Sequence, residues 1–255
     1  IGLTEPNSGS DLAGLRTTAV MDGNEFVING AKTFVTNGII GDLLLLAAST
    51  DPSKGAKGVS MFLIDTKTEG YKKGKKLKKV GNKAQDTAEL FFDDMRVPAD
   101  ALLGGDEFGW GMLMHGLARE RMVVAVRSMA MCEAALEQTV AYTKERKAFK
   151  QRIFDFQNTQ FKLAELATAI HAIRPFVDEC IQAVAEDRLT AETAAMAKLA
   201  TTELADRVLD DCVQLHGGYG YMWEYPIARA WADARIHRIY AGTNEIMKII
   251  ISRTL

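Results

Sequence analysis

The chain has 255 residues, which is enough for one large domain or two ordinary ones. Its composition, 47% hydrophobic and 25% charged, is that of an ordinary globular protein and excludes intrinsic disorder, collagen-like repeats and coiled coils. With 31 Lys and Arg against 33 Asp and Glu, the net charge of -2 provides no general attraction for nucleic acid or for an anionic membrane.

The first hundred residues are rich in short strand-like runs. These runs cover residues 17–21, 25–28, 33–36, 43–48, 59–64 and 88–92. The triplet Asp22-Gly23-Asn24 separates the first two runs, and Gly and Asn tolerate the positive φ of a tight hairpin turn. The pattern predicts antiparallel β structure.

After Gly104 and Gly105 the spacing of apolar residues becomes helical. We expect helices near 108–145, 155–187, 190–215, 226–238 and 243–254. Thr190 and Thr243 are plausible N-cap residues, and Pro226 suits the first turn of a helix. Long helices with short connections favour an antiparallel bundle. No apolar run approaches the roughly 20 residues that a membrane span needs.

Cysteine, histidine and lysine are the residue types that could form a metal or anion site in this sequence. Cys132, Cys180 and Cys212 are far apart, and the four histidines are scattered, so we expect no metal site and a reducing compartment. Eight lysines lie between residues 67 and 83 together with three glycines. This cluster is either a solvated loop or edge strand, which we favour, or a site for an anionic group such as a phosphate.

Common catalytic templates are absent from the sequence. It has no GxSxG, HExxH or Walker string, and the glycines near 218 lack the dinucleotide-fingerprint spacing. Six unusual strings remain: TEPNSGSD (4–11), FVTNG (34–38), RKAF (146–149), FQ (156–157), QLHGG (214–218) and YAGTNEI (240–246). Taken singly, each is turn or capping chemistry, although glycines beside hydroxyl and amide groups can also bind phosphate or a heteroaromatic ring.

Together and in this order, these strings resemble the acyl-CoA dehydrogenase family of flavoenzymes. The strings HGLARERMVVA (115–125), RKAF and QLHGGYGYMWEYPIARA (214–230) look most like its long-chain branch. The resemblance implies an α+β multidomain chain, with an antiparallel β-barrel or sandwich-like middle domain at 1–104 and an antiparallel four-helix bundle at 105–255. The helical N-terminal domain of the family has no counterpart in these residues.

The same resemblance implies the activity and its partners. The expected reaction is FAD-dependent α,β-dehydrogenation of an acyl-CoA to trans-2-enoyl-CoA in fatty acid β-oxidation, and a long-chain acyl-CoA is the expected substrate. The implied partners are the acyl-CoA substrate, electron-transferring flavoprotein and further copies of the chain in a homotetrameric dimer of dimers. The expected location is the bacterial cytoplasm, which we prefer, or the mitochondrial matrix in a eukaryote. Two alternatives remain open, an acyl-CoA oxidase and a non-catalytic flavin-binding or assembly fragment.

The catalytic base is expected to be Glu120. Many family members carry a glutamate directly before the Gly-Thr of the closing string, where this chain has Ala241, which cannot accept a proton. The long-chain and isovaleryl branches instead use a glutamate on the first long helix of the C-terminal domain, and the string LARERM matches that alternative at Glu120. The competing interpretation is a surface glutamate paired with Arg119 or Arg121.

The resemblance also implies the remaining roles. The flavin cofactor would contact Thr4, Ser10, Phe34, Thr36, Arg146, Phe149, Gln157, Gln214, Gly217, Gly218, Thr243 and Glu245, partly across a subunit interface. The substrate would contact Ser10, Arg121, Ala241 and Gly242, with the Ala241 amide donating to the thioester carbonyl. Relatives commonly have Trp where this chain has Phe34. No metal is expected.

Overall fold

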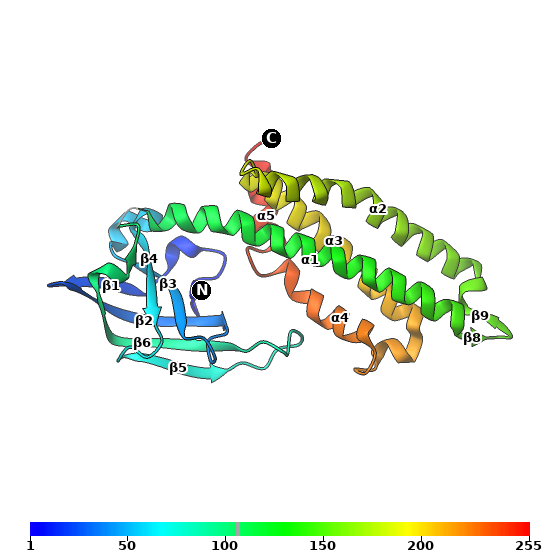
Figure 1. The fold of residues 1–255 in the computed structure, drawn as a ribbon, viewed down its shortest axis with the longest axis horizontal. Helices are drawn as coiled ribbons and strands as arrows, with labels where there is room; N and C mark the ends of the chain where they lie inside the picture. Colours follow the sequence, from blue (N-terminus) through cyan, green and yellow to red (C-terminus); the bar gives the residue numbers. More distant parts are fainter. Residues whose placement is uncertain (106–107) are drawn as a thin grey trace. The chain divides into compact units, whose positions relative to one another are not determined.

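A seven-stranded sheet forms in the first part of the chain (Figure 1). The computed structural model describes residues 1–105 and 108–255. The strands are β1 Thr18–Asp22, β2 Glu25–Thr36, β3 Leu43–Ser49, β4 Val59–Asp65, β5 Tyr71–Lys76, β6 Thr87–Pro98 and β7 Leu102–Leu103, in the order β5-β6-β2-β1-β3-β4-β7. Short 3-10 turns occur at η1 Leu12–Gly14, η2 Pro52–Gly58 and η3 Ala99–Ala101. The strand-rich first part predicted from alternation is confirmed.

Pairing in the sheet is antiparallel with one exception. β1 and β2 form the predicted hairpin, in which Asp22 pairs with Glu25 and Gly23 has a φ of 66°. β1 and β3 pair in parallel at Thr18 and Ser49, because the chain reverses once into β2 and again before β3. The predicted antiparallel β structure is confirmed for the other strand pairs, and this one parallel junction makes the sheet mixed.

Strand β2 joins two of the predicted runs into one irregular strand. Its pairing with β6 shifts register between Ile28 and Gly30 and again between Lys32 and Val35. Gly30 has a φ of 148°, and a Cβ at this position would meet the Thr17 hydroxyl oxygen at 2.5 Å, so a side chain cannot fit there. The second shift includes Phe34, which has a φ of 58°. The two bulges explain why the alternation along the sequence was interrupted.

The lysine-rich segment forms an edge strand. β5 pairs only with β6 among the described residues, and most of its side chains are exposed. Lys72 forms an ion pair with Asp93 at 2.6 Å, and Lys73 donates to the Ile39 carbonyl at 2.7 Å. This agrees with the favoured interpretation, in which lysines protect an exposed sheet edge.

Helices make up the second part of the chain. They are α1 Gly109–Glu145, α2 Gln157–Ala185, α3 Ala191–His216, α4 Pro226–Ala234 and α5 Asn244–Ser252, with 3-10 turns η4 Ile153–Asp155, η5 Gly217–Tyr221 and η6 Arg235–Arg238 and a two-stranded hairpin, β8 Lys147–Ala148 and β9 Gln151–Arg152. Successive long helices α1, α2 and α3 reverse direction (Figure 1). Thr190 and Thr243 accept the N-cap hydrogen bonds predicted for them, and Pro226 begins α4.

The chain divides into two compact units, residues 1–115 and 116–255. The first has a core of strand residues that includes Phe26, Ile28, Leu46, Phe62 and Leu90. The main core of the second contains Met129, Leu166, Leu209, Ile227 and further small or apolar residues of α1 to α4. Across residues 1–105 and 108–255, no helix has both the length and the apolar character needed to cross a membrane.

Candidate functional site

The opening string is anchored to strand β2 by a buried ion pair. The Glu5 carboxylate accepts from Lys32 Nζ at 2.7 Å and from the amides of Arg16 and Thr17 at 2.6 and 2.9 Å. The Thr4 carbonyl accepts from the Thr33 amide at 2.8 Å. These contacts place Thr4 beside the strand that carries Phe34 and Thr36.

Three of the four predicted flavin contacts of the first unit are open to solvent, and Thr4 is half-buried. Phe34 is 68% exposed, although it is a large apolar side chain on a strand. Ser10 and Thr36 are also exposed. An exposed aromatic ring with nearby hydroxyl groups is suited to contact a ring system that has polar edges.

Glu120 is an exposed carboxylate of the second unit. It lies on α1, and among the described residues it forms neither a hydrogen bond nor an ion pair. The two arginines considered as ion-pair partners of Glu120 have other contacts. Arg119 pairs with Asp187 at 2.9 Å, and Arg121 donates to the Ala241 carbonyl at 3.3 Å. Partial removal from solvent raises the pKa of the Glu120 carboxyl, and the Arg121 charge opposes this effect.

The closing string forms a turn with an unusual backbone. Ala241 has a φ of 53° and Gly242 a φ of 89°, so two successive residues adopt the left-handed region. A Cβ on Gly242 would meet the Met247 side chain at 2.8 Å. The amides of Ala241, Gly242 and Thr243 have no hydrogen-bond acceptor within the described part of the chain. Successive free amides in such a turn form a concavity that suits an oxygen with negative charge.

The carbonyls of this turn are held by two buried cations from two helices. Arg121 on α1 is 6% exposed and donates through Nε to the Ala241 carbonyl. Lys198 on α3 is fully buried and donates through Nζ to the Gly242 carbonyl at 2.5 Å and to Asn244 Oδ1 at 3.3 Å. Helix α5 then begins with Thr243 as its N-cap.

Glu245 lies in the first turn of α5 and is exposed. Its own backbone N–H and the Thr243 side chain lower the pKa of its carboxyl, so it is ionised at neutral pH. A carboxylate at this position also interacts favourably with the helix dipole.

The other predicted cofactor contacts gather at the distal end of α1. Arg146 lies over the ring of Tyr219, with Cζ 5.5 Å from the ring centroid, and Tyr219 follows Gly217 and Gly218 directly. The two glycines have open space where a Cβ would lie. Tyr142 joins α1 to α3 by donating to the His216 carbonyl at 3.1 Å.

Phe149, Gln157 and Gln214 lie in the same part of the second unit. Phe149 is 90% exposed at the tip of the β8-β9 hairpin. Its ring centroid lies 6.2 Å from that of Phe156, the residue directly before Gln157, which begins α2. Gln214 is exposed in the last turn of α3, and its carbonyl accepts from the Gly217 amide. These residues surround the hairpin and the glycine turn rather than the Ala241 turn.

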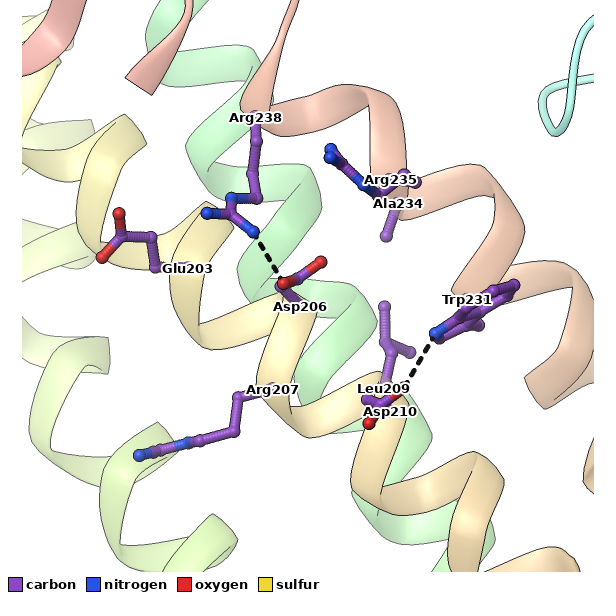
Figure 2. A pocket seen from close by; sticks show the side chains of 9 residues that line it. All are labelled: Glu203, Asp206, Arg207, Leu209, Asp210, Trp231, Ala234, Arg235 and Arg238. Atoms are coloured by element: carbon purple, nitrogen blue, oxygen red, sulfur yellow. Dashed lines mark hydrogen bonds and ion pairs between the residues drawn. The ribbon is translucent and has the colours of Figure 1, made fainter. Parts of the chain in front are cut away.

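A hollow between α3, α4 and η6 does not include the predicted site. Figure 2 shows its lining residues, in which Arg238 pairs with Asp206 at 2.7 Å and Trp231 donates to Asp210 at 3.3 Å. None of the nine lining residues was predicted to bind cofactor or substrate. Glu203, a further lining residue, forms an ion pair with Lys248 of α5 at 3.6 Å.

Sequence reasoning missed Lys198, Asn244 and Thr202. Asn244 is buried and donates through Nδ2 to the Thr202 hydroxyl at 3.1 Å, which ties the start of α5 to α3. A signal for Lys198 was present, because it shares one helix face with Ala194 and Thr201, four residues before it and three after it. A lysine among small residues on a buried face needs a specific acceptor.

Comparisons with known proteins agree over the whole chain. Residues 1–95 match the family model "Acyl-CoA dehydrogenase, middle domain", and residues 107–255 match "Acyl-CoA dehydrogenase, C-terminal domain". The chain is 49% identical to the long-chain specific acyl-CoA dehydrogenase, mitochondrial, of Sus scrofa over 100% of its own length and 60% of that protein. It is 40% identical to an acyl-CoA dehydrogenase of Bacillus subtilis, over 99% and 67% respectively.

Solved structures give the same result. The acyl-CoA dehydrogenase of Geobacillus kaustophilus superposes with a TM-score of 0.97 at 48% identity, covering 99% of this chain and 67% of that one. Butyryl-CoA dehydrogenase of Megasphaera elsdenii gives a TM-score of 0.96 at 38% identity, covering 99% and 66%. The chain thus spans about two thirds of these structures and 60% of the pig relative. On the matches of both its parts, the chain belongs to the acyl-CoA dehydrogenase family.

Proposed function

We propose that this chain carries the FAD-binding and acyl-CoA-binding parts of an acyl-CoA dehydrogenase, with Glu120 as the base that removes the α-proton of the thioester. The observation that carries the assignment is the state of Glu120, which has a raised pKa and neither a hydrogen bond nor an ion pair among the described residues, and which directly precedes the arginine that contacts the Ala241 turn. A raised pKa makes the carboxylate a stronger base while it is ionised.

Members of this family are FAD flavoproteins, and the residues of this chain fit that cofactor. Exposed Phe34 offers an apolar face for the flavin ring, and Thr36 offers a hydroxyl. Arg146 and the open backbone of Gly217 and Gly218 suit a pyrophosphate, since a guanidinium binds phosphate oxygens in pairs. When bound, FAD supplies the hydride acceptor at N5.

The chain itself supplies proton transfer and charge stabilisation. Glu120 takes a proton from Cα while a hydride leaves Cβ, so that the substrate loses two hydrogens and gains a trans double bond. Negative charge then grows on the thioester oxygen. The free Ala241 amide is the proposed donor to that oxygen, because a positioned N–H group stabilises developing charge without reorganisation.

A single substitution tests the base. Glu120→Gln removes the proton acceptor but keeps the size of the side chain, and Glu137→Gln on the same helix is the matched control because Glu137 is exposed and outside the site. With anaerobic hexadecanoyl-CoA, we expect Glu120→Gln to retain FAD and to bleach its absorbance about 100- to 10,000-fold more slowly than the parent chain. Glu137→Gln should react normally.

Other outcomes separate the alternatives. Near-normal reduction of Glu120→Gln would reject Glu120 as the base. A parent chain that binds neither FAD nor acyl-CoA would favour the non-catalytic assembly fragment. Rapid reoxidation of the reduced parent chain in air would favour an acyl-CoA oxidase.

The two clusters of predicted cofactor contacts support assembly into a homo-oligomer. Arg146 directly follows the end of α1, and the part of α1 from Glu120 to Glu145 is about 38 Å long. One extended dinucleotide does not span that length, so we propose that Arg146, Phe149 and the glycine turn contact the cofactor of another copy in a dimer of dimers. Size-exclusion chromatography with light scattering measures the assembly, and a monomer that retains tightly bound FAD would contradict this arrangement.

The proposed electron acceptor and cellular location are inferred from the names of similar proteins. One similar protein is a subunit of a caffeyl-CoA reductase-Etf complex, and we propose that electron-transferring flavoprotein also accepts electrons from this protein. The relatives include mitochondrial and bacterial proteins. We propose the mitochondrial matrix or the bacterial cytoplasm accordingly, and long-chain acyl-CoA as substrate because the 49% identical relatives carry that name.

A further inference from the structure

We propose that Lys198 is a positioning residue that holds the Gly242 carbonyl and thereby, together with Arg121 on the preceding carbonyl, fixes the backbone of the turn whose Ala241 amide faces the substrate. The proposal starts from a lysine that is fully buried on α3 and has no carboxylate partner among the described residues. Its Nζ donates one hydrogen bond to the Gly242 carbonyl of the turn and one to the side chain of Asn244, the first residue of α5.

Burying a charged group without an ion-pair partner lowers the stability of the folded chain. A lysine in this position is therefore expected to have a specific structural role. Lys198 acts together with Arg121, which holds the preceding carbonyl, that of Ala241. Two successive carbonyls are therefore turned toward buried cations from two different helices.

The direction of these carbonyls determines the direction of the amides. In a planar trans peptide, the C=O of one residue and the N–H of the next point to opposite sides. With the Ala241 and Gly242 carbonyls turned toward Arg121 and Lys198, the amides of Gly242 and Thr243 point away from the two cations. The left-handed φ of Ala241, which an L-residue rarely adopts, is then stabilised by contacts on the carbonyl side of the turn.

Asn244 extends the same hold into α5. Its Oδ1 accepts from Lys198, and its Nδ2 donates to Thr202, one helical turn further along α3. The turn is thus fastened on both sides of Thr243, whose side chain caps α5 by accepting from the Ile246 amide at 3.4 Å. Loosening Lys198 should release the turn and the first turn of α5 together.

This inference rests on the proposed function, because the fixed turn matters only if a thioester oxygen lies against its Ala241 amide. The test uses the full chain with Lys198→Met, which keeps the length and apolar stem but cannot donate. Thr201→Val is the matched control, since Thr201 is equally buried on α3 and bonds only within its own helix. If Lys198→Met does not fold, Lys198→Gln, which keeps one donor group with shorter reach, takes its place.

The first readout needs neither cofactor nor turnover. The amides of Ile246 and Met247 bond to Thr243, and their hydrogen exchange reports how firmly the turn is held. We expect about tenfold faster exchange at these two amides in Lys198→Met, the effect of losing one hydrogen bond from a charged donor. Thr201→Val should leave their exchange unchanged. Equal exchange in Lys198→Met and the parent chain would overturn the proposal.

The second readout concerns the contact between the Ala241 amide and the thioester carbonyl. With FAD bound, the infrared carbonyl stretch of trans-2-hexadecenoyl-CoA labelled with ¹³C at the thioester carbon should move back toward its value in solution in Lys198→Met. For hexadecanoyl-CoA, kcat should fall about 10- to 100-fold while KM changes less than about threefold, because misaimed donors cost rate more than binding. Thr201→Val should show none of these changes. An equal loss of kcat in Thr201→Val would mean that Lys198 contributes only through packing, which would overturn the proposal.

The two proposals fail in different ways. If the parent chain does not reduce FAD with any acyl-CoA, the proposed function is wrong, and the exchange of Ile246 and Met247 still decides whether Lys198 holds the turn. If the parent chain is active and Lys198→Met matches it in exchange, infrared band and kcat, the proposed function stands and the role of Lys198 is wrong.

Discussion

Each unit contains a buried lysine, and the two lysines differ in whether a carboxylate lies beside them. Lys32 is 1% exposed and forms an ion pair with Glu5 at 2.7 Å, while Lys198 is 0% exposed and, in the part of the chain that the structure describes, donates only to neutral oxygens. Lys32 fastens the opening string to a strand, and Lys198 fastens the closing turn to a helix. In the first unit the buried lysine has an ion-pair partner, whereas in the second the buried lysine has none among the described residues and lies at a turn whose Ala241 has a positive φ.

The largest loss of stability is expected when Lys32 loses its carboxylate partner and so becomes, like Lys198, a buried lysine without an ion pair. Glu5→Gln leaves neutral acceptors for the Lys32 ammonium and for the amides of Arg16 and Thr17. Because the buried cation then lacks an anion, we expect the free energy of unfolding to fall by about 3–5 kcal/mol. Urea denaturation measures this loss.

A double variant checks the cause of that loss. Adding Lys32→Met to Glu5→Gln removes the unpaired cation and should recover part of the stability. If the double variant is as unstable as the sum of the two single variants, the pair contributes no coupling, and the contrast between the two lysines disappears.

The second effect is a pH dependence specific to Lys198. Burial, assisted by the charge of Arg121 and opposed by Glu245, lowers the pKa of Lys198 from 10.5 to about 8. Between these values the unfolded chain binds a proton that the folded chain has lost, so the free energy of unfolding should rise with pH. The contribution is at most about 1.4 kcal/mol per pH unit from this one group. Below about pH 8 both states are protonated and the contribution is constant.

Urea denaturation between pH 7.5 and 10 tests this expectation, with Lys198→Met as the comparison. His237, whose charge also interacts with Lys198, has a pKa of about 4 because of burial, and it stays neutral throughout this range. The parent chain should gain stability relative to Lys198→Met as the pH rises. Parallel stability curves for the two chains would show that Lys198 does not titrate in this window.

The smallest effect is expected at the start of α3, the helix that carries Lys198. Thr190 caps α3 by accepting from the Thr193 amide at 3.1 Å. Thr190→Ala should lower the free energy of unfolding by about 1 kcal/mol. Thermal unfolding measures it, and exchange at Ile246 and Met247 should not change. Faster exchange there would mean that general weakening of α3, and not Lys198, loosens the Ala241 turn.

Elements with local signals were predictable from the sequence. The hairpin at Gly23, the caps at Thr190 and Thr243, and the start of α4 at Pro226 depend on hydrogen bonds and backbone preferences within a few residues. The lysine-rich β5 had no apolar alternation, and only its pairing with β6 makes it a strand. The assignments of Glu120 and of the domain boundary after residue 104 remain predictions.

The amino-acid sequence by itself determined the strand-then-helix order, the caps and the family strings, because each depends on neighbours along the chain. The tertiary structure alone decided that Arg121 contacts a carbonyl 120 residues away, that Lys198 is buried without a carboxylate, and that Glu120 has no partner among the described residues. The physical reason is that burial and long-range hydrogen bonds arise from packing between helices. A charged side chain in a sequence carries no sign of which distant oxygen it will reach.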